Sequence, residues 1–314
     1  MYAITRLAYP DNLHMDDVHQ TFRKLHRFLQ GKSHAKEWVF HNDDLIGFYT
    51  SVPQERILKA IRHLLSTYLA VHPPTKNKIM FTVDLLQTQS NQRVFRRKTR
   101  KHAKHTYNID FEDIQELVQM SLSLSYFVSM GVVYSQIRGS CIGSQISPTL
   151  CNITVAYEEV MWQKTFNVQL NSMGFFTRYV DNRMCIVPRV LPAISPLHAF
   201  LQLDFYGEPV TLEQVGDMHF LGFNVDLAQR TVSYITPESE HKYRSTHSAG
   251  SKRMALTGAV SRLHLICRNT FPRKDVIQAC QALASKYIQF GASAEDFQAC
   301  QIKILARYRL RMSK

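Results

Sequence analysis

The chain has 314 residues, of which 45% are hydrophobic and 20% charged, and its formal net charge is +13. This apolar content suffices for one large core or two smaller ones, so a disordered chain is excluded. The charge predicts a polyanionic partner, with nucleic acid first and an anionic membrane surface second. The most apolar run, residues 118–134, is interrupted by serines, so we expect no membrane-spanning helix and no membrane partner.

The first part of the chain is expected to hold a lead-in helix, a strand and a second helix. Apolar residues at helical spacing predict a helix over 18–29 that ends at Gly31. Residues 37–45 have the pattern of a strand that runs into two carboxylates. Ser51 is a candidate N-cap for a helix that starts near Pro53.

The middle of the chain combines further predicted helices with a basic segment. We expect a strand over 78–86, a helix from Asp110 to about Phe127 and a helix from Pro148 to about Trp162. Between the first two lies a dense run of arginines and lysines, residues 93–104. Such a run binds phosphates or forms a solvated charged face, and the net charge of the chain favours phosphate binding.

The last part is predicted to change from strands to helices. Residues 175–187 are typical of a β-hairpin with its tip at 179–182, and 210–225 predict further strand. Beyond about residue 237 the pattern is mostly helical. We therefore expect two domains, 1–236 and 237–314. Six cysteines without C-x-x-C spacing favour a reducing compartment, either the cytoplasm or the nucleus.

Two aspartates are the strongest candidates for chemistry. Phosphoryl transfer from a nucleoside triphosphate commonly uses two divalent cations about 3.5–4 Å apart, held by carboxylates. Asp44 at the end of a strand and Asp181 at a hairpin tip suit this role, and hard oxygen ligands select Mg²⁺. Neighbouring strand residues point to opposite faces, so we select Asp44 over Asp43. Asp84 is a weaker rival, and an ordinary turn aspartate stays the alternative reading of each.

Four segments, in this order, resemble motifs of reverse transcriptases. His41–Arg56 resembles motif A, Tyr134–Asn152 motif B, Arg178–Asn182 motif C and Phe220–Phe223 the motif E primer grip. The resemblance is closest to Penelope-like retroelements and the telomerase catalytic subunit, and covers about residues 38–225. It implies an α+β fold: a polymerase palm with an antiparallel sheet backed by helices, reduced fingers and a C-terminal α-helical thumb.

The resemblance also implies an activity and its residues. The chain would be an RNA-directed DNA polymerase of a retroelement, with an RNA template, a DNA primer, dNTP and two Mg²⁺ ions, for which Mn²⁺ could substitute. The implied catalytic residues are Asp44, Asp181 and Asn182, and the implied metal ligands are Asp44, Leu45 and Asp181. Tyr49 would be the gate that rejects a 2′-hydroxyl, and Gly143 and Ser144 would contact the nucleotide. The residues expected to contact nucleic acid are Arg97, Lys98, Arg138, Phe220, Leu221, Gly222, Lys252 and Arg253.

Departures from the motifs keep alternatives open. Asn182 stands where motif C usually has a second aspartate, so the site loses one negative charge and should hold Mg²⁺ more weakly. The second hypothesis is therefore a non-catalytic nucleic-acid-binding relic of the fold, and the third is an RNA-directed RNA polymerase, which Tyr49 disfavours. About forty residues precede motif A, without recognisable fingers motifs or a telomerase RNA-binding domain, so we do not expect telomerase itself. The oligomeric state is left open.

Overall fold

The computed structural model describes residues 2–15, 17–31, 37–73, 81–84, 94–96, 106–141, 144–216, 218–235, 252–289 and 292–310. The chain forms two compact units, each built from separated segments. The first comprises Met1–His14, Asp44–Gln169 and Ser195–Glu213, and the second comprises Met15–Asp43, Leu170–Ile194 and Gln214–Lys314. The chain therefore passes from the second unit into the first within a single strand, between Asp43 and Asp44.

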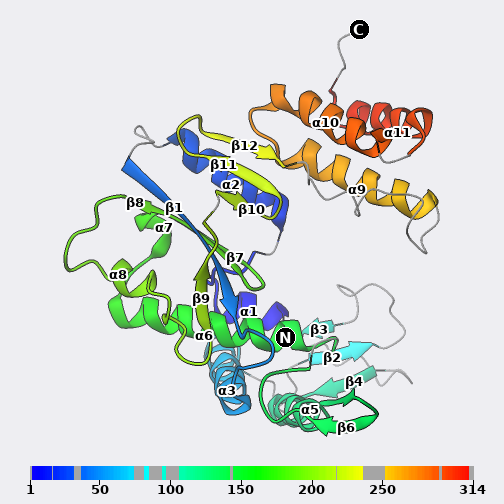
Figure 1. Cartoon of the computed structure of the whole chain (residues 1–314). Coiled ribbons are helices and arrows are strands. Elements are labelled where there is room, and N and C mark those ends of the chain that lie inside the picture. The colour runs from blue at the N-terminus through cyan, green and yellow to red at the C-terminus, as the bar shows by residue number, and fades with distance from the viewer. Residues whose placement is uncertain are drawn as a thin grey trace. The chain divides into compact units, whose positions relative to one another are not determined.

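Helices form the core of the first unit (Figure 1). They are α1 (Tyr2–Ala8), α3 (Gln54–Val71), α5 (Phe111–Ser123), α6 (Ser147–Phe166) and α8 (Leu197–Phe200). α3 buries Ile57, Ile61, Leu64 and Leu65 on one face and packs against α6 and α1. α6 is buried on most of its circumference, as expected of a central helix. α3 begins at Gln54 after Pro53 and has no side-chain cap, so the expected Ser51 cap was wrong.

The strands of the first unit include two small antiparallel sheets. β2 (Phe81–Asp84) lies between β3 (Val94–Arg96) and β4 (Thr106–Ile109), and β5 (Tyr126–Ser129) pairs with β6 (Val132–Ser135). The helix expected to reach Phe127 was too long, because α5 ends at Ser123. Aromatic and β-branched residues favour strand at 126–128, and Met130 and Gly131, with φ of 50° and 78°, form the hairpin turn.

Strands β1 (Trp38–Ile46), β7 (Phe175–Tyr179), β8 (Asn182–Pro188) and β9 (Thr211–Gln214) form a sheet of order β7-β8-β1-β9. The predicted hairpin at 175–187 is confirmed by the antiparallel pair β7–β8. The short helix α7 (Leu170–Met173) precedes β7. The predicted lead-in helix is also confirmed as α2 (Val18–Gly31), whose buried face packs against side chains of β8 in the second unit.

An antiparallel sheet within the second unit contains β10 (His219–Phe220), β11 (Phe223–Asp226) and β12 (Thr231–Tyr234). Leu221 and Gly222 both have positive φ, 51° and 81°, which is the conformation of a two-residue type I′ hairpin turn. Phe22 of α2 packs on this sheet, with its ring centroid 4.8 Å from that of Phe223.

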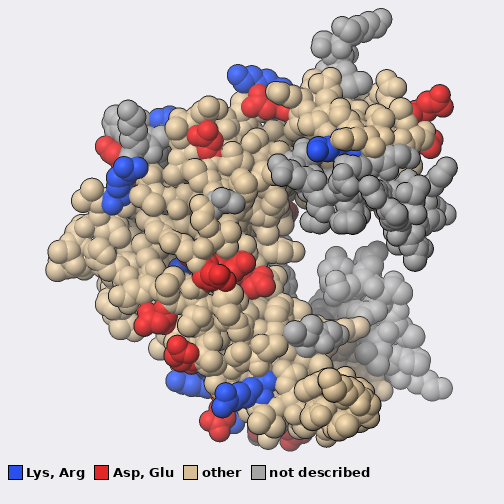
Figure 2. Space-filling model, in the orientation of Figure 1, with Lys and Arg blue, Asp and Glu red and all other residues tan. Residues whose placement is uncertain are grey.

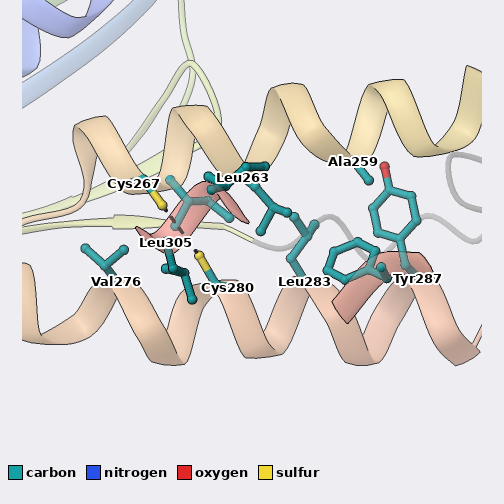
Figure 3. Close-up of a cluster of buried hydrophobic side chains, with 11 residues drawn as sticks. Ala259, Leu263, Cys267, Val276, Cys280, Leu283, Tyr287 and Leu305 are labelled. Carbon is teal, nitrogen blue, oxygen red and sulfur yellow. Dashed lines mark hydrogen bonds between the residues drawn. The ribbon is translucent and has the colours of Figure 1, made fainter. Parts of the chain in front are cut away.

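The C-terminal part of the second unit is helical, as the sequence predicted. It contains α9 (Lys252–Asn269), the 3-10 helix η3 (Arg273–Asp275), α10 (Val276–Gln289) and α11 (Ala294–Arg307). These helices enclose their own apolar cluster, in which Leu263, Leu283 and Leu305 interdigitate (Figure 3). The α+β class with a C-terminal helical region is therefore confirmed. The domain cut near 237 stays a prediction, because residues 236–251 lie outside the described ranges.

Among the helices that the structure describes, none combines the length and the apolar character needed to cross a membrane.

Candidate functional site

Asp181 lies at the tip of the β7–β8 hairpin. Tyr179 pairs with Asn182 across the ladder, so the loop consists of Val180 and Asp181 alone. Val180 has φ of 56°, a conformation that is rare for a β-branched side chain and stores local strain. The Asp181 side chain is exposed and that of Asn182 is half-buried. The tight turn therefore presents one carboxylate to solvent at a fixed point of the sheet.

Two buried arginines hold this hairpin from within. Arg178 and Arg183 lie directly opposite each other in the β7–β8 ladder, and both are fully buried. The Arg178 Nη1 donates to the Val180 carbonyl oxygen at 2.8 Å. The Arg183 Nε and Nη2 donate to Asp43 Oδ2 at 3.1 and 2.8 Å. Like charges that face each other destabilise a sheet, and the Asp43 carboxylate offsets the charge of Arg183.

The two adjacent aspartates of β1, Asp43 and Asp44, have different surroundings. Asp43 is buried and paired with Arg183, and strand alternation turns Asp44 toward the opposite face of β1. Asp44 is half-buried, and Leu45 after it is buried. Asp43 is therefore engaged in the sheet, and the catalytic role expected of Asp44 stays a prediction. The rival Asp84 ends β2 in a different sheet.

The metal site itself stays a prediction. Asp44 belongs to the first unit and Asp181 to the second, so the convergence of their carboxylates is an expectation of the motif resemblance. In the described part of the chain, no group of three or more His, Cys, Asp or Glu side chains is arranged to hold a metal ion. The expected ligand set contains only two carboxylates, so this finding does not decide the case.

The segment after Asp44 is fixed against the loop of motif B, within the first unit. Ser140 N–H donates to the Tyr49 carbonyl at 2.7 Å, and Gly139 N–H donates to the Val52 carbonyl at 2.7 Å. The Tyr49 ring is half-buried and meets Phe48 edge to face at 4.8 Å. The structure therefore brings parts of motifs A and B together at the predicted gate residue.

The close contact between this loop and the backbone of Tyr49 and Thr50 requires a glycine at position 139. Its φ is +71°, and a Cβ there would lie 2.2 Å from the Tyr49 carbonyl oxygen and 2.6 Å from the Thr50 carbonyl carbon. Only a residue without a side chain allows this approach. Gly143, which was predicted to let the backbone approach the nucleotide, lies outside the described residues. The glycine within Arg138-Gly139-Ser140 was the signal available for finding Gly139.

A buried serine pair holds the same loop to the start of α6. The Ser140 hydroxyl donates to Ser147 Oγ at 2.5 Å, and the Ser147 hydroxyl donates to the Cys141 carbonyl at 2.6 Å. These serines were not among the predicted site residues. Ser144, predicted to contact the nucleotide, is half-buried and its N–H donates to the Cys141 carbonyl at 3.1 Å. Arg138 is exposed.

The remaining nucleic-acid candidates have different environments. Phe220 is 1% exposed and packs in the core near Phe22, so its side chain supports the sheet. Leu221 is half-buried against the same core, and Gly222 is exposed, with its carbonyl accepting from the Ile235 N–H at 2.9 Å. Arg97 and Lys98 lie outside the described residues, as do the side chains of Lys252 and Arg253 at the start of α9.

His41 is a titratable residue of β1 that lies just before the two aspartates. Burial lowers the pKa of His41, while Asp43 raises it and Arg183 lowers it. The ring lies 3.4 Å from Gln214 Nε2. Near neutral pH we therefore expect the uncharged form of His41, which adds no positive charge beside the aspartates.

Comparisons with known proteins identify the fold. Neither a family model nor a curated protein matches the sequence. Telomerase from Candida albicans in complex with a fragment of telomeric RNA matches with a TM-score of 0.55 and 12% identity, over 96% of this chain and 53% of that chain. Telomerase from Candida tropicalis with the same kind of RNA matches with a TM-score of 0.55 and 11% identity, over 100% of this chain and 53% of that chain. Apo telomerase from Candida tropicalis matches with a TM-score of 0.53 and 13% identity, over 100% of this chain and 57% of that chain.

This chain thus spans little more than half the length of the telomerase chains that it matches. At such low identity the likeness concerns the fold, and the chain has the fold that these telomerases share. The predicted α+β fold with a C-terminal helical region matches that of these telomerase chains.

Proposed function

We propose that the chain is an RNA-directed DNA polymerase, which transfers a nucleotide from a dNTP to a primer 3′-hydroxyl. The observation that supports this proposal most is the exposed Asp181 on a two-residue turn that Arg178 holds by a hydrogen bond. The chain that carries it has the fold of telomerases. The net charge of +13 suits a template–primer duplex. A retroelement origin is part of the proposal and rests on the motif resemblance alone.

The donor set fits a pair of divalent cations. Asp44 and Asp181 offer carboxylate oxygens, the ligands that Mg²⁺ prefers, and Asn182 offers a neutral amide oxygen. When bound, such ions activate an attacking hydroxyl and offset charge on the leaving pyrophosphate. Because the site has one carboxylate fewer than motif C usually has, we expect it to bind Mg²⁺ more weakly. Activity should then need a higher Mg²⁺ concentration.

The protein's own groups would position the reactants. The Val180 carbonyl is held by Arg178, which fixes the turn that carries Asp181. The Tyr49 backbone is held by Ser140, so the ring that would pack against the sugar has a fixed base. Fixed positions of this kind lower the entropy cost of bringing primer and nucleotide together.

The first prediction is that Asp181→Ala abolishes primer extension. On an RNA template with a DNA primer, the full chain is expected to incorporate dNTPs with Mg²⁺ or Mn²⁺. Removing this carboxylate should lower the rate at least about 100-fold, equivalent to about 2.7 kcal/mol of transition-state stabilisation. Asp11→Ala, which removes another exposed aspartate, is the matched control and should retain activity.

The same assay separates the alternatives. A nucleic-acid-binding relic, which Asn182 favours, would bind the duplex without incorporation, both as the natural chain and as Asn182→Asp. That result would overturn the enzymatic proposal. Preferential use of ribonucleotides would instead assign the chain to the RNA-synthesising polymerases.

A further inference from the structure

The β5–β6 hairpin of the first unit exposes an unusual amount of apolar surface. All eight residues of the two strands are exposed, so neither face of the hairpin is covered. Val128 and Val133, which face each other across the ladder, are 69% and 65% exposed, and Met130 at the tip is fully exposed. Phe127 stacks on Tyr134 at 5.4 Å, and both rings remain about half exposed. A surface like this usually marks an interaction site.

The hairpin is also free of charge. No Asp, Glu, Lys or Arg occurs from Leu117 to Ile137, in a chain whose composition is 20% charged. Figure 2 shows the surface over this hairpin without acidic or basic side chains. Phosphate binding needs cations, and natural edge strands are usually guarded by charges or proline. The composition therefore disfavours nucleic acid as the partner of this surface and favours protein.

The hairpin is held firmly on the first unit. Gln136 N–H donates to the Ser125 carbonyl at 2.8 Å and closes its base, and Gln54 Nε2 donates to the Gln136 carbonyl at 3.1 Å. Within the described residues, β5 and β6 pair only with each other. The hairpin is thus a fixed, two-stranded projection with both outer edges open to pairing.

We propose that the β5–β6 hairpin binds the same hairpin of a second copy of this chain, in a symmetric dimer. Two chains of charge +13 repel each other, and contact through an uncharged surface brings no like charges together. An apolar surface related to itself by a two-fold axis is complementary in polarity by construction.

The available area agrees with such a dimer. Eleven large apolar side chains between Leu117 and Ile137 are exposed. At roughly half exposure they offer on the order of 1,000 Å² of apolar surface, summed over both faces of the hairpin and the end of α5. A stable dimer needs about 800 Å² from each partner. This inference is independent of the proposed polymerase activity, because no catalytic candidate takes part in it.

The test is the oligomeric state of the full chain in analytical ultracentrifugation at about 10 μM, where a specific dimer should form. The unmodified chain is expected to sediment as a dimer. The pair Val128→Lys and Val133→Glu should sediment as a monomer. Its two charges face each other across the ladder, so they support the hairpin while they charge its surface and leave the net charge unchanged.

The matched control is Val190→Lys with Ile194→Glu. These residues are 83% and 94% exposed and lie outside the hairpin, so this variant should remain a dimer. As a second measurement, Ser129→Cys in the hairpin should give a covalent dimer with a short bis-maleimide, above the background of the unmodified chain. A monomeric unmodified chain, or a dimer that persists in the charged hairpin variant, would overturn the proposal. So would hairpin-dependent binding to liposomes or single-stranded RNA by a monomeric chain.

Discussion

The buried pair Asp43–Arg183 gives the two adjacent aspartates of β1 different environments. Arg183 is directly opposite Arg178, and the Asp43 carboxylate accepts two hydrogen bonds from Arg183. The pair also joins β8 to β1, which are neighbours in the sheet. It therefore fixes the position of the hairpin that carries Asp181 relative to β1 within the second unit.

At the scale of single residues, we predict that Asp43→Leu destabilises the fold by about 3–5 kcal/mol, because it removes the carboxylate that accepts two hydrogen bonds from a fully buried guanidinium. Urea unfolding at neutral pH measures this cost. The double variant Asp43→Leu with Arg183→Met should lose less than the single variant, since it removes the Arg183 charge together with the Asp43 carboxylate. A double variant as unstable as the sum of both single variants would show that the two side chains do not act as a pair.

The environment of Asp43 shows what residue patterns can and cannot predict. Strand alternation selected Asp44 over Asp43, and the role of Asp44 stays a prediction, whereas the structure shows Asp43 buried and paired with Arg183. The partner of Asp43 could not be predicted, because the two residues are 140 positions apart. Only the ladder between distant strands brings such residues together.

At the scale of elements, the hairpin β7–β8 was predictable and β5–β6 was not. Residues 175–187 have a strand pattern interrupted at one point, and the structure turns at that point. Residues 110–127 continue an apolar pattern of helical type past the end of α5. The aromatic and β-branched run from Tyr126, followed by Met130 and Gly131 at positive φ, ends that helix in favour of a hairpin.

The loop that follows β6 gives the prediction at this scale. Gly139→Ala should destabilise the fold by about 2–4 kcal/mol, because the new Cβ would overlap the Tyr49 carbonyl and the residue would keep its positive φ. Gly222→Ala is the control, since its φ is also positive and its Cβ would meet open space. It should lose only about 1 kcal/mol, the cost of the backbone conformation. Equal shifts of the urea midpoint in the two variants would contradict the close approach of the loop to Tyr49.

At the scale of the whole molecule, we predict that half-buried histidines make the fold sensitive to acid. Burial lowers the pKa of His26, His41, His63 and His264, which are distributed over both units. His63 shows the cause well. Its Nδ1 lies 2.7 Å from the Tyr9 hydroxyl, its ring packs on Tyr157 at 5.0 Å, and Lys59 and Lys164 lower its pKa further.

The sign of the effect follows from linkage. An unfolded chain protonates these histidines near their ordinary pKa of about 6.5, whereas the folded chain does so only at lower pH. As the pH falls below about 6.5, the unfolded state therefore binds more protons, and stability is lost until the folded pKa is reached. The melting temperature should thus be lower at pH 5.5 than at pH 7.5.

In His63→Gln this difference should shrink, because glutamine keeps a polar partner for Tyr9 and cannot be protonated. The exposed residue His198 provides the control His198→Gln, which should keep the full difference between the two pH values. If His63→Gln also kept the full difference in melting temperature, the acid sensitivity would not come from His63 of α3 and its contacts with Tyr9 and Tyr157.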